Sequence, residues 1–150
     1  MPRTNPPLSV SLPGTWELLS RIDVAESGER RVEPSLGSDP VALLIYDRAG
    51  HFAVQFMKRD RSDAGAPEVA SVGSNNSRAI GGYDAYFGTY TVDDATNMVT
   101  QRLLASLARE NVGLLLSREM TVTGDQLVIG LQTVVQGEPV TRTLTWRRVG

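Results

Sequence analysis

The sequence predicts an all-β protein in which eight antiparallel strands close into an up-and-down barrel. Turn residues such as Gly, Asn and Asp recur at regular intervals along the chain. The segments between them alternate apolar and polar residues with the period of two that is typical of half-buried strands. Strands joined by short turns form a meander, and closing the meander removes its exposed edges. An eight-stranded barrel is wide enough to hold one small ligand.

Composition supports one globular domain. The chain has 150 residues, of which 41% are hydrophobic and 21% charged, and a domain of this size can bury a core without disulfides or metal. It contains no cysteine, which excludes disulfides, a thiolate nucleophile and metal sites with sulfur ligands. The net charge of -2 is spread along the chain, so we expect no nucleic-acid partner.

The first thirteen residues are rich in proline and contain no uninterrupted apolar run. Such a segment resembles neither a signal peptide nor a membrane anchor. We therefore expect a flexible N-terminal leader over 1–13, followed by the barrel domain over 14–150, in a cytoplasmic protein without a membrane partner. The sequence leaves open whether the protein forms a homodimer.

The first strand is predicted over 14–25. The residues of one parity are apolar: Trp16, Leu18, Ile22 and Val24. Charged residues occupy the other parity: Glu17, Arg21 and Asp23. Because successive side chains of a strand point to opposite faces, the apolar set is expected to face the core.

The second and third strands, over 41–46 and 51–58, form a predicted hairpin. Between them, Asp47 opens a four-residue turn that ends in Gly50, which is typical of a type I turn with glycine in the left-handed position. The following stretch, 59–82, is rich in Asp, Ser, Gly and Asn. Within it, Ser77 is a candidate N-cap of a short helix through Tyr86, between strands three and four.

The remaining five strands are predicted over 86–92, 98–107, 114–122, 127–135 and 140–149. Short turns rich in Asp, Asn and Gly separate most of them. Together with the first three strands, they complete the count of eight.

The residues also resemble a known family. Gly14-Thr15-Trp16 matches the Gly-x-Trp opening of lipocalins, and the last strand supplies Arg147 and Arg148, where lipocalins place a basic residue against that Trp. The longer pattern comprises Leu44-Ile45-Tyr46-Asp47, Gly50-His51-Phe52-Ala53-Val54-Gln55 and Tyr83-Asp84-Ala85-Tyr86-Phe87-Gly88-Thr89-Tyr90. Over 14–149, the chain resembles the bacterial and fungal lipocalin-like domain family of small proteins.

This resemblance implies a calycin-type, lipocalin-like barrel with a hydrophobic pocket. Family members occur beside genes of natural-product biosynthesis and stress, which implies a role in secondary metabolism. The sequence departs from the family pattern in strand five, where many relatives carry histidines. Here the matching stretch contains Gln101 and Arg102, so any chemistry that those imidazoles perform is missing from this chain.

His51 is the only histidine, so a metal site with several His ligands is excluded. It follows the turn glycine at a strand start, where a rim residue bonded to a backbone carbonyl is the simpler interpretation and an acid or base the alternative. The sequence contains no Gly-x-Ser-x-Gly elbow, phosphate loop or dinucleotide fingerprint. We expect neither a cofactor nor a metal, and the catalytic residues stay unknown.

Polar and aromatic residues on the strands supply the candidate ligand-binding set. Its members are Gln55, Met57, Tyr83, Tyr86, Tyr90, Arg118 and His51. Arg118 shares its parity with Leu116 and Met120, and a buried guanidinium needs an acceptor from the protein or a ligand unless it reaches a barrel mouth. Gly88, between two tyrosines of one parity, leaves room for a ligand or for the bend of the barrel.

Two functional hypotheses require this pocket, and a third predicts that it is absent. The first is binding of a small, largely hydrophobic metabolite by a carrier or sensor. The alternative is a cofactor-independent enzyme of secondary metabolism (an isomerase, cyclase or dehydratase), in which a Tyr, an Arg or His51 polarises one group. A purely structural module would instead have a filled barrel without a cavity.

Overall fold

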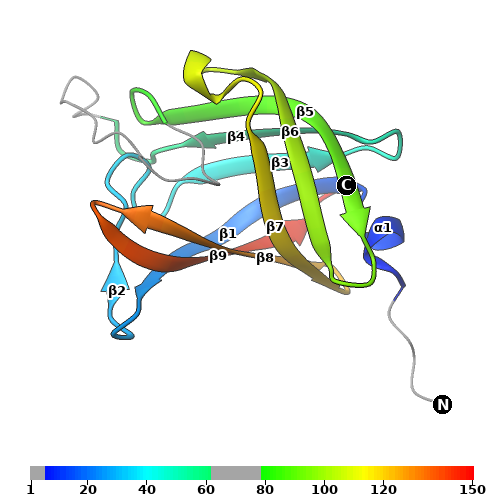
Figure 1. Cartoon of the computed structure of the whole chain (residues 1–150), viewed down its shortest axis with the longest axis horizontal. Helices are drawn as coiled ribbons and strands as arrows, with labels where there is room; N and C mark the ends of the chain where they lie inside the picture. The colour runs from blue at the N-terminus through cyan, green and yellow to red at the C-terminus, as the bar shows by residue number, and fades with distance from the viewer. Residues whose placement is uncertain (1–5, 62–78) are drawn as a thin grey trace.

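The computed structural model describes residues 6–61 and 79–150, which form one antiparallel sheet closed into a barrel (Figure 1). The strands are β1 (Gly14–Ala25), β2 (Arg30–Arg31), β3 (Val41–Tyr46), β4 (His51–Met57), β5 (Tyr83–Asp93), β6 (Met98–Ser106), β7 (Leu115–Thr123), β8 (Gln126–Val135) and β9 (Glu138–Arg148). The helices are α1 (Leu8–Ser11) and a single 3-10 turn, η1 (Arg109–Asn111).

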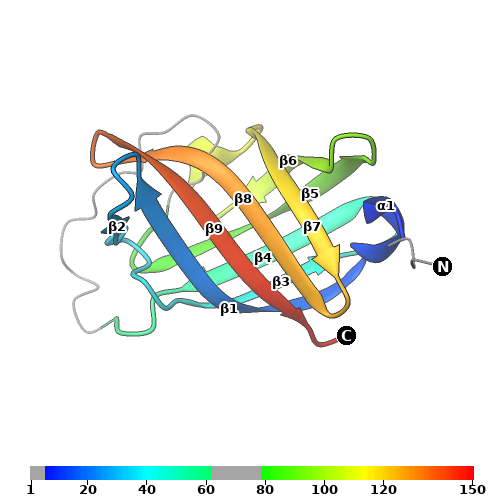
Figure 2. The same ribbon diagram turned by 90° about the horizontal axis from the view of Figure 1, so that it is seen from below.

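The strand order is β2-β1-β3-β4-β5-β6-β7-β8-β9, and pairing of β1 with β9 closes the barrel. Figure 2 shows β1, β9, β8 and β7 crossing the viewer's side at a common tilt. The predicted all-β class and the closed barrel of eight antiparallel strands are confirmed. β2 is an additional short strand that pairs with the end of β1.

The predicted helix between strands three and four is wrong over its described part, which begins at Ala79. There Ile80 and Tyr83 exchange backbone hydrogen bonds of 2.7 and 3.0 Å. Gly81 and Gly82 between them have φ values of 62° and 74°, a left-handed conformation that glycine adopts without strain. The two glycines therefore make a tight turn into β5. Ser77, the predicted N-cap, lies in 62–78, which is outside the described residues.

Instead, α1 lies at the N-terminal side of the barrel, within the segment expected to be a loose leader. Leu8 and Leu12 are buried in the core. The backbone N–H and the hydroxyl of Ser9 donate to the carboxylate of Asp94, at 2.9 and 2.6 Å. Leu8, Ser9 and Leu12 thus attach this segment to the barrel, whereas the division into a leader over 1–13 and a domain over 14–150 stays a prediction.

A β-bulge changes which residues of β1 face the interior. The register between β1 and β9 shifts between Leu18 and Ser20, so one extra residue reverses the alternation beyond it. Arg21 and Asp23 are consequently buried, whereas Ile22 and Val24 are only half-buried. The sequence-based assignment of Arg21 and Asp23 to the solvent face is wrong.

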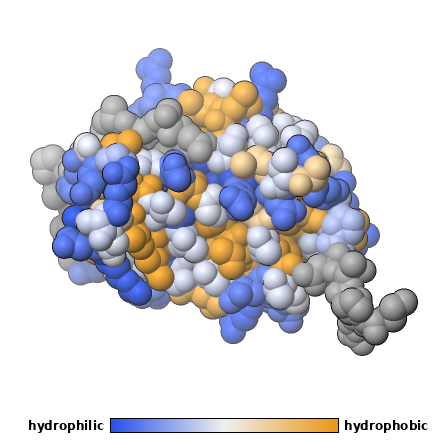
Figure 3. All heavy atoms as spheres, turned by 60° about the horizontal axis from the view of Figure 1, so that its bottom comes forward, coloured by the Kyte–Doolittle hydropathy of each residue, from blue (hydrophilic) through white to orange (hydrophobic). Residues whose placement is uncertain are grey.

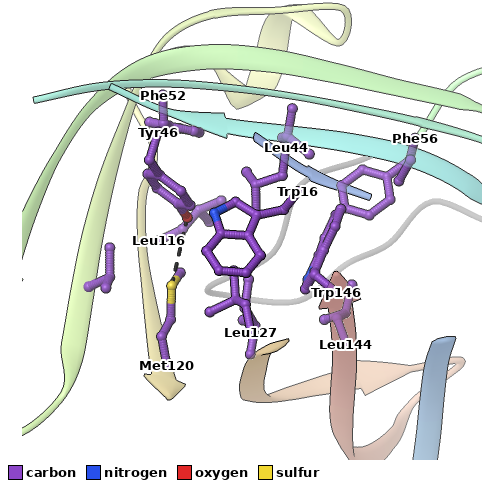
Figure 4. Packing of buried hydrophobic residues seen from close by; sticks show 14 of the residues in the cluster. Trp16, Leu44, Tyr46, Phe52, Phe56, Leu116, Met120, Leu127, Leu144 and Trp146 are labelled. Atoms are coloured by element: carbon purple, nitrogen blue, oxygen red, sulfur yellow. Dashed lines mark hydrogen bonds between the residues drawn. The ribbon is translucent and has the colours of Figure 1, made fainter. Parts of the chain in front are cut away.

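The core fills the barrel half that lies next to α1. Its fully buried side chains include Trp16, Leu44, Tyr46, Leu116, Met120 and Leu127, and Figure 4 shows them converging on Trp16 from several strands. The rings of Tyr46 and Tyr90 meet edge to face at 4.8 Å between centroids, and those of Phe56 and Trp146 at 5.8 Å. These rings and aliphatic side chains therefore pack densely around Trp16 in this half.

On the outer face shown in Figure 3, apolar areas are interrupted by polar residues, as expected for strands with one side toward water. Neither helix in the described part of the chain has the length and apolar composition needed to span a membrane.

Candidate ligand-binding site

Trp16 and Arg148 seal one end of the barrel. The indole Nε1 of Trp16 donates to the carbonyl of Leu12 at 3.0 Å, and the Arg148 guanidinium carbon lies 4.3 Å from the centroid of the Trp16 ring. Arg148 also donates to the carbonyls of Pro13, at 3.0 Å, and Ser11. The last strand thus ties α1 and β1 together at this end.

The glycine of the Gly-x-Trp motif makes room for that arginine. A Cβ on Gly14 would lie 2.3 Å from the Nη1 atom of Arg148, which is far closer than non-bonded atoms approach. Of the two basic residues that the sequence offered, Arg148 covers Trp16, whereas Arg147 pairs with Glu17 on the outer face at 3.0 Å.

The other half of the barrel keeps a cavity of about 50 Å³. Its polar lining comes from Arg21, Glu33, Ser35, Tyr86, Arg118 and Arg142. Its apolar lining comes from Leu36, Phe56, Ala79, Leu131 and Leu144. A space of this volume holds a few water molecules or one small polar group, so the site is a niche with charged walls rather than a large apolar chamber.

Arg142, which lines this cavity, belongs to a buried ion pair. Asp23 on β1 and Arg142 on β9 are direct cross-strand partners. The Nε and Nη2 atoms of Arg142 donate to the two carboxylate oxygens of Asp23, at 2.7 and 2.9 Å. This is the bidentate geometry in which a guanidinium and a carboxylate match best, so the two side chains neutralise each other.

Glu33 is held by the loop that contains it. Its carboxylate accepts the backbone N–H groups of Ser35 and Leu36, both at 3.1 Å, and the hydroxyl of Ser35. The Nη2 atom of Arg21 lies 3.6 Å from the same carboxylate, beyond normal hydrogen-bond length. Arg21 is therefore attracted by Glu33 but is not tightly paired with it.

Arg118 reaches the cavity from β7, and its Nη1 atom donates to the carbonyl of Ser117 at 3.0 Å. Burial lowers the pKa of Arg118, and the positive charge of Arg142 lowers it further. Burial also lowers the pKa of Arg21, to about 10, with Arg142 again adding to the effect. Both guanidiniums are thus cations held at a cost in free energy.

Two of the seven sequence-predicted site residues line this cavity: Tyr86 and Arg118. Tyr90 also points inward, but its ring meets that of Tyr46 edge to face and its hydroxyl donates to the carbonyl of Asp47, at the sealed end. The ligand-binding role of Tyr86 and Arg118 stays a prediction.

The other four candidates lie on the outside of the barrel. The hydroxyl of Tyr83 donates to the Oε1 atom of Gln55 there, and Met57 shares their face because it pairs with Tyr83 across the sheet. His51 is exposed, with its Nδ1 atom 3.5 Å from the Asp47 carboxylate. Phe52, Val54 and Phe56 are the β4 residues that face inward, so this arrangement does not bring these four to the cavity.

Gly88 serves the bend of the barrel. A Cβ on this residue would lie 1.7 Å from the carbonyl oxygen of Arg102, and the register between β5 and β6 shifts between Phe87 and Gly88. The missing side chain therefore admits the neighbouring backbone. Of the two interpretations that the sequence left open, the structure supports the bend rather than space for a ligand.

Sequence reasoning missed Arg21, Glu33 and Arg142. Arg142 could have been found, because it shares its parity with Val140, Leu144 and Trp146 along the last strand. Arg21 was hidden by the bulge in β1, and Glu33 lies in a loop without periodicity. No group of three or more His, Asp or Glu side chains in 6–61 and 79–150 is placed to hold a metal ion.

A family model described as a lipocalin-like domain matches residues 13–149. No curated protein matches the chain. A barrel of this kind suggests small-molecule binding in general, in agreement with a cavity at one end. The matched region contains every strand of the barrel, and the chain belongs to the lipocalin-like domain family.

Proposed function

We propose that the protein binds a small, largely hydrophobic metabolite at the unsealed end of the barrel, as a carrier or sensor. The observation that supports this most is the cavity of about 50 Å³ at the end of the barrel away from Trp16, where polar and apolar side chains line the same space. Apolar walls with a few converging polar groups are typical of small-molecule sites.

The cavity volume restricts how such a ligand binds. Pockets that enclose a whole drug-sized molecule measure about 300–1,000 Å³, several times more than the space here. In our proposal, the polar end of the ligand enters the cavity and its apolar part contacts Leu36 and Phe56, which line the same space. Burial of that apolar part supplies much of the binding free energy.

Tyr86 and Arg118 favour a second candidate, the cofactor-independent isomerase, cyclase or dehydratase of secondary metabolism. A phenol and a guanidinium line one cavity, and both donate hydrogen bonds. Two donors aimed at one carbonyl stabilise the negative charge that develops there in an enolisation or elimination. Under this alternative, the same two residues would polarise the substrate.

Native mass spectrometry of the protein purified from its host extract without denaturant tests the binding proposal. We expect one retained small molecule per chain, and its loss in the Arg118→Met variant, because that variant keeps an unbranched apolar stem but removes the guanidinium and its charge. Arg102→Met is the matched control, since Arg102 is exposed on β6. Circular dichroism checks that both variants fold. A wild-type chain without bound mass, or full retention by folded Arg118→Met, contradicts the proposal.

The same preparation separates a carrier from an enzyme. The released molecule is added back to fresh protein and followed by NMR over hours. An unchanged spectrum supports the carrier or sensor, whereas a new product supports the enzyme. The cytoplasmic location, the homodimer, the link to secondary metabolism and the absence of nucleic-acid and membrane partners stay predictions from the sequence.

A further inference from the structure

The outer face of β3 consists entirely of aliphatic side chains. Val41, Leu43 and Ile45 alternate with the buried residues of this strand and remain 43%, 44% and 40% exposed. Single exposed aliphatic residues are ordinary, but a contiguous surface of them indicates an interaction site. The outward residues along most of β9 are, by contrast, Thr141, Thr143, Thr145 and Arg147.

The register of the sheet extends this apolar surface across β3, β4, β5 and β6, which are neighbours in the barrel (Figure 1). Successive partners on these four strands form one outward-facing row: Ile45, Ala53, Phe87 and Ala105. The adjacent row contains Leu43, Gln55 and Ala85. We call this surface the β3–β6 face.

The centre of the β3–β6 face carries no formal charge. No Asp, Glu, Lys or Arg occupies an outward position on β3, on β4, or on β5 between Tyr83 and Thr89. Charged groups lie at the rim, where the guanidinium carbon of Arg61 is 5.7 Å from the centroid of the Tyr83 ring and Arg102 is exposed on β6. An uncharged centre within a polar rim is typical of protein–protein interfaces.

A hollow of about 290 Å³ lies over β4, β5 and β6 on this face. Its lining includes the small side chains of Ala53, Ala85 and Ala105. Phe87, which is 53% exposed, lines the same hollow. An apolar cavity of about 150 Å³ admits benzene, so the hollow has room for a phenyl ring. The β3–β6 face thus carries both a projecting ring and a space that accepts one.

The area of the face suits a dimer of modest stability. Four strands about 4.8 Å apart, with about seven residues each at about 3.3 Å per residue, cover roughly 450 Å² in projection. Because side chains project from the sheet, the accessible area is larger, and two copies would bury about 1,000 Å² or more, the lower limit for a specific interface. The net charge of only -2 per chain gives weak repulsion between copies.

We propose that a second copy of this chain docks on the β3–β6 face, related by a two-fold axis that places Phe87 of each copy in the hollow of the other. In a two-fold interface the same patch serves both partners, so a patch with both a ring and a hollow is complementary to itself. The two sheets pack face to face, about 10 Å apart. The contact uses outward side chains, so it does not depend on the ligand proposed for the interior.

Sedimentation equilibrium of the full chain, from about 1 to 200 μM, measures the association. We expect the average mass to rise with concentration toward twice the 16.3 kDa of one chain. A mass that stays at that of one chain throughout would overturn the proposal. A monomer that instead floats with phosphatidylcholine vesicles would assign the face to a lipid surface, and would overturn it as well.

Variants locate the contact on the β3–β6 face. Phe87→Glu places two carboxylates in one apolar interface, because a two-fold dimer contains each residue twice, and should weaken dimerisation at least about hundredfold. Ala53→Gln fills the hollow without adding charge and should weaken dimerisation about tenfold. Thr141→Glu is the control, since it adds the same charge at an exposed position of β9, and it should associate like the wild type.

Circular dichroism checks that each variant folds. Should Phe87→Glu unfold, Ala53→Gln still decides, because Ala53 is exposed and its replacement disturbs no core contact. Wild-type association by the folded Phe87 and Ala53 variants would place the interface elsewhere and overturn the assignment. Equal weakening by Thr141→Glu would overturn it too, since the effect would then follow charge and not position.

Discussion

The guanidinium of Arg148 covers the indole of Trp16, with 4.3 Å between the guanidinium carbon and the ring centroid. This contact joins the last strand to the first and is continued by hydrogen bonds to Ser11 and Pro13. Arg148→Met should therefore lower the free energy of unfolding by about 2–3 kcal/mol, as a cation–π contact and buried hydrogen bonds are lost together.

Urea denaturation measures this loss, and Arg147→Met is the control on the neighbouring residue. Arg147 makes an exposed ion pair with Glu17, and exposed pairs contribute little to stability. Similar destabilisation by the two variants would show that the Trp16 contact is not what makes Arg148 important.

The buried pair of Asp23 and Arg142 provides a second test. Asp23→Asn should destabilise the fold by about 3–5 kcal/mol, because the guanidinium stays buried without its counter-ion. The double variant Asp23→Leu/Arg142→Met removes both charges and should be markedly more stable than the sum of the single losses predicts. A double-mutant cycle by chemical denaturation gives the coupling energy, and additive losses would argue against a strong pair.

Gly88 and Gly130 form a matched pair of strand glycines. A Cβ at Gly88 would collide with the Arg102 carbonyl, whereas a Cβ at Gly130 would meet nothing within 4 Å. Gly88→Ala should cost more than about 2 kcal/mol or prevent folding, since backbone must move. Gly130→Ala should be close to neutral in thermal denaturation, and equal melting temperatures for the two variants would contradict the close approach of β6.

Tyr46 makes stability depend on alkaline pH. Its hydroxyl accepts a hydrogen bond from Gln101 and donates to the sulfur of Met120 at 3.8 Å, and burial raises its pKa above the ordinary value. The unfolded chain loses this proton near pH 10, while the folded chain keeps it. The stability that Tyr46 contributes is thus complete below about pH 10 and falls as the pH rises above it.

Denaturation at pH 9 and pH 11 tests whether the free energy of unfolding falls as the pH rises. Wild type should lose more stability between the two values than Tyr46→Phe, which has no phenol to ionise at this position. Absorbance of tyrosinate should appear for Tyr46 only on unfolding. An equal loss in both proteins would assign the alkaline effect to other groups.

Most of the barrel was predictable because its strands obey alternation. β1 and β3 were predicted with their exact bounds. The parity that Arg118 shares with Leu116 and Met120 left two positions open, the interior and a barrel mouth, and the side chain is buried. The bulge after Leu18 could not be seen, because one inserted residue leaves apolar side chains on both parities. It is this bulge that turns Arg21 toward the cavity.

The candidate site was harder to predict than the fold. Gln55 and Tyr83 contact each other on the outer face. A polar and an aromatic residue suit such a surface contact as well as they suit a ligand, so residue type alone did not distinguish the two positions. Glu33 acquires its position from hydrogen bonds with Ser35 and Leu36 in a loop, for which the sequence carries no periodic pattern. Only tertiary pairing of distant strands brings these charges to one place.

The pairing of Thr15 with the end of the chain has a practical consequence for assays. Thr15 N–H donates to the carbonyl of Gly150 at 3.0 Å, and Val149 N–H donates to that of Thr15 at 2.8 Å, beside the sealed end marked by α1 and the C-terminus in Figure 1. A linker fused after Gly150 would therefore tether the barrel to a chip with its arginine-lined end facing the flowing sample. An optical biosensor built this way would report analyte capture without steric interference from the support.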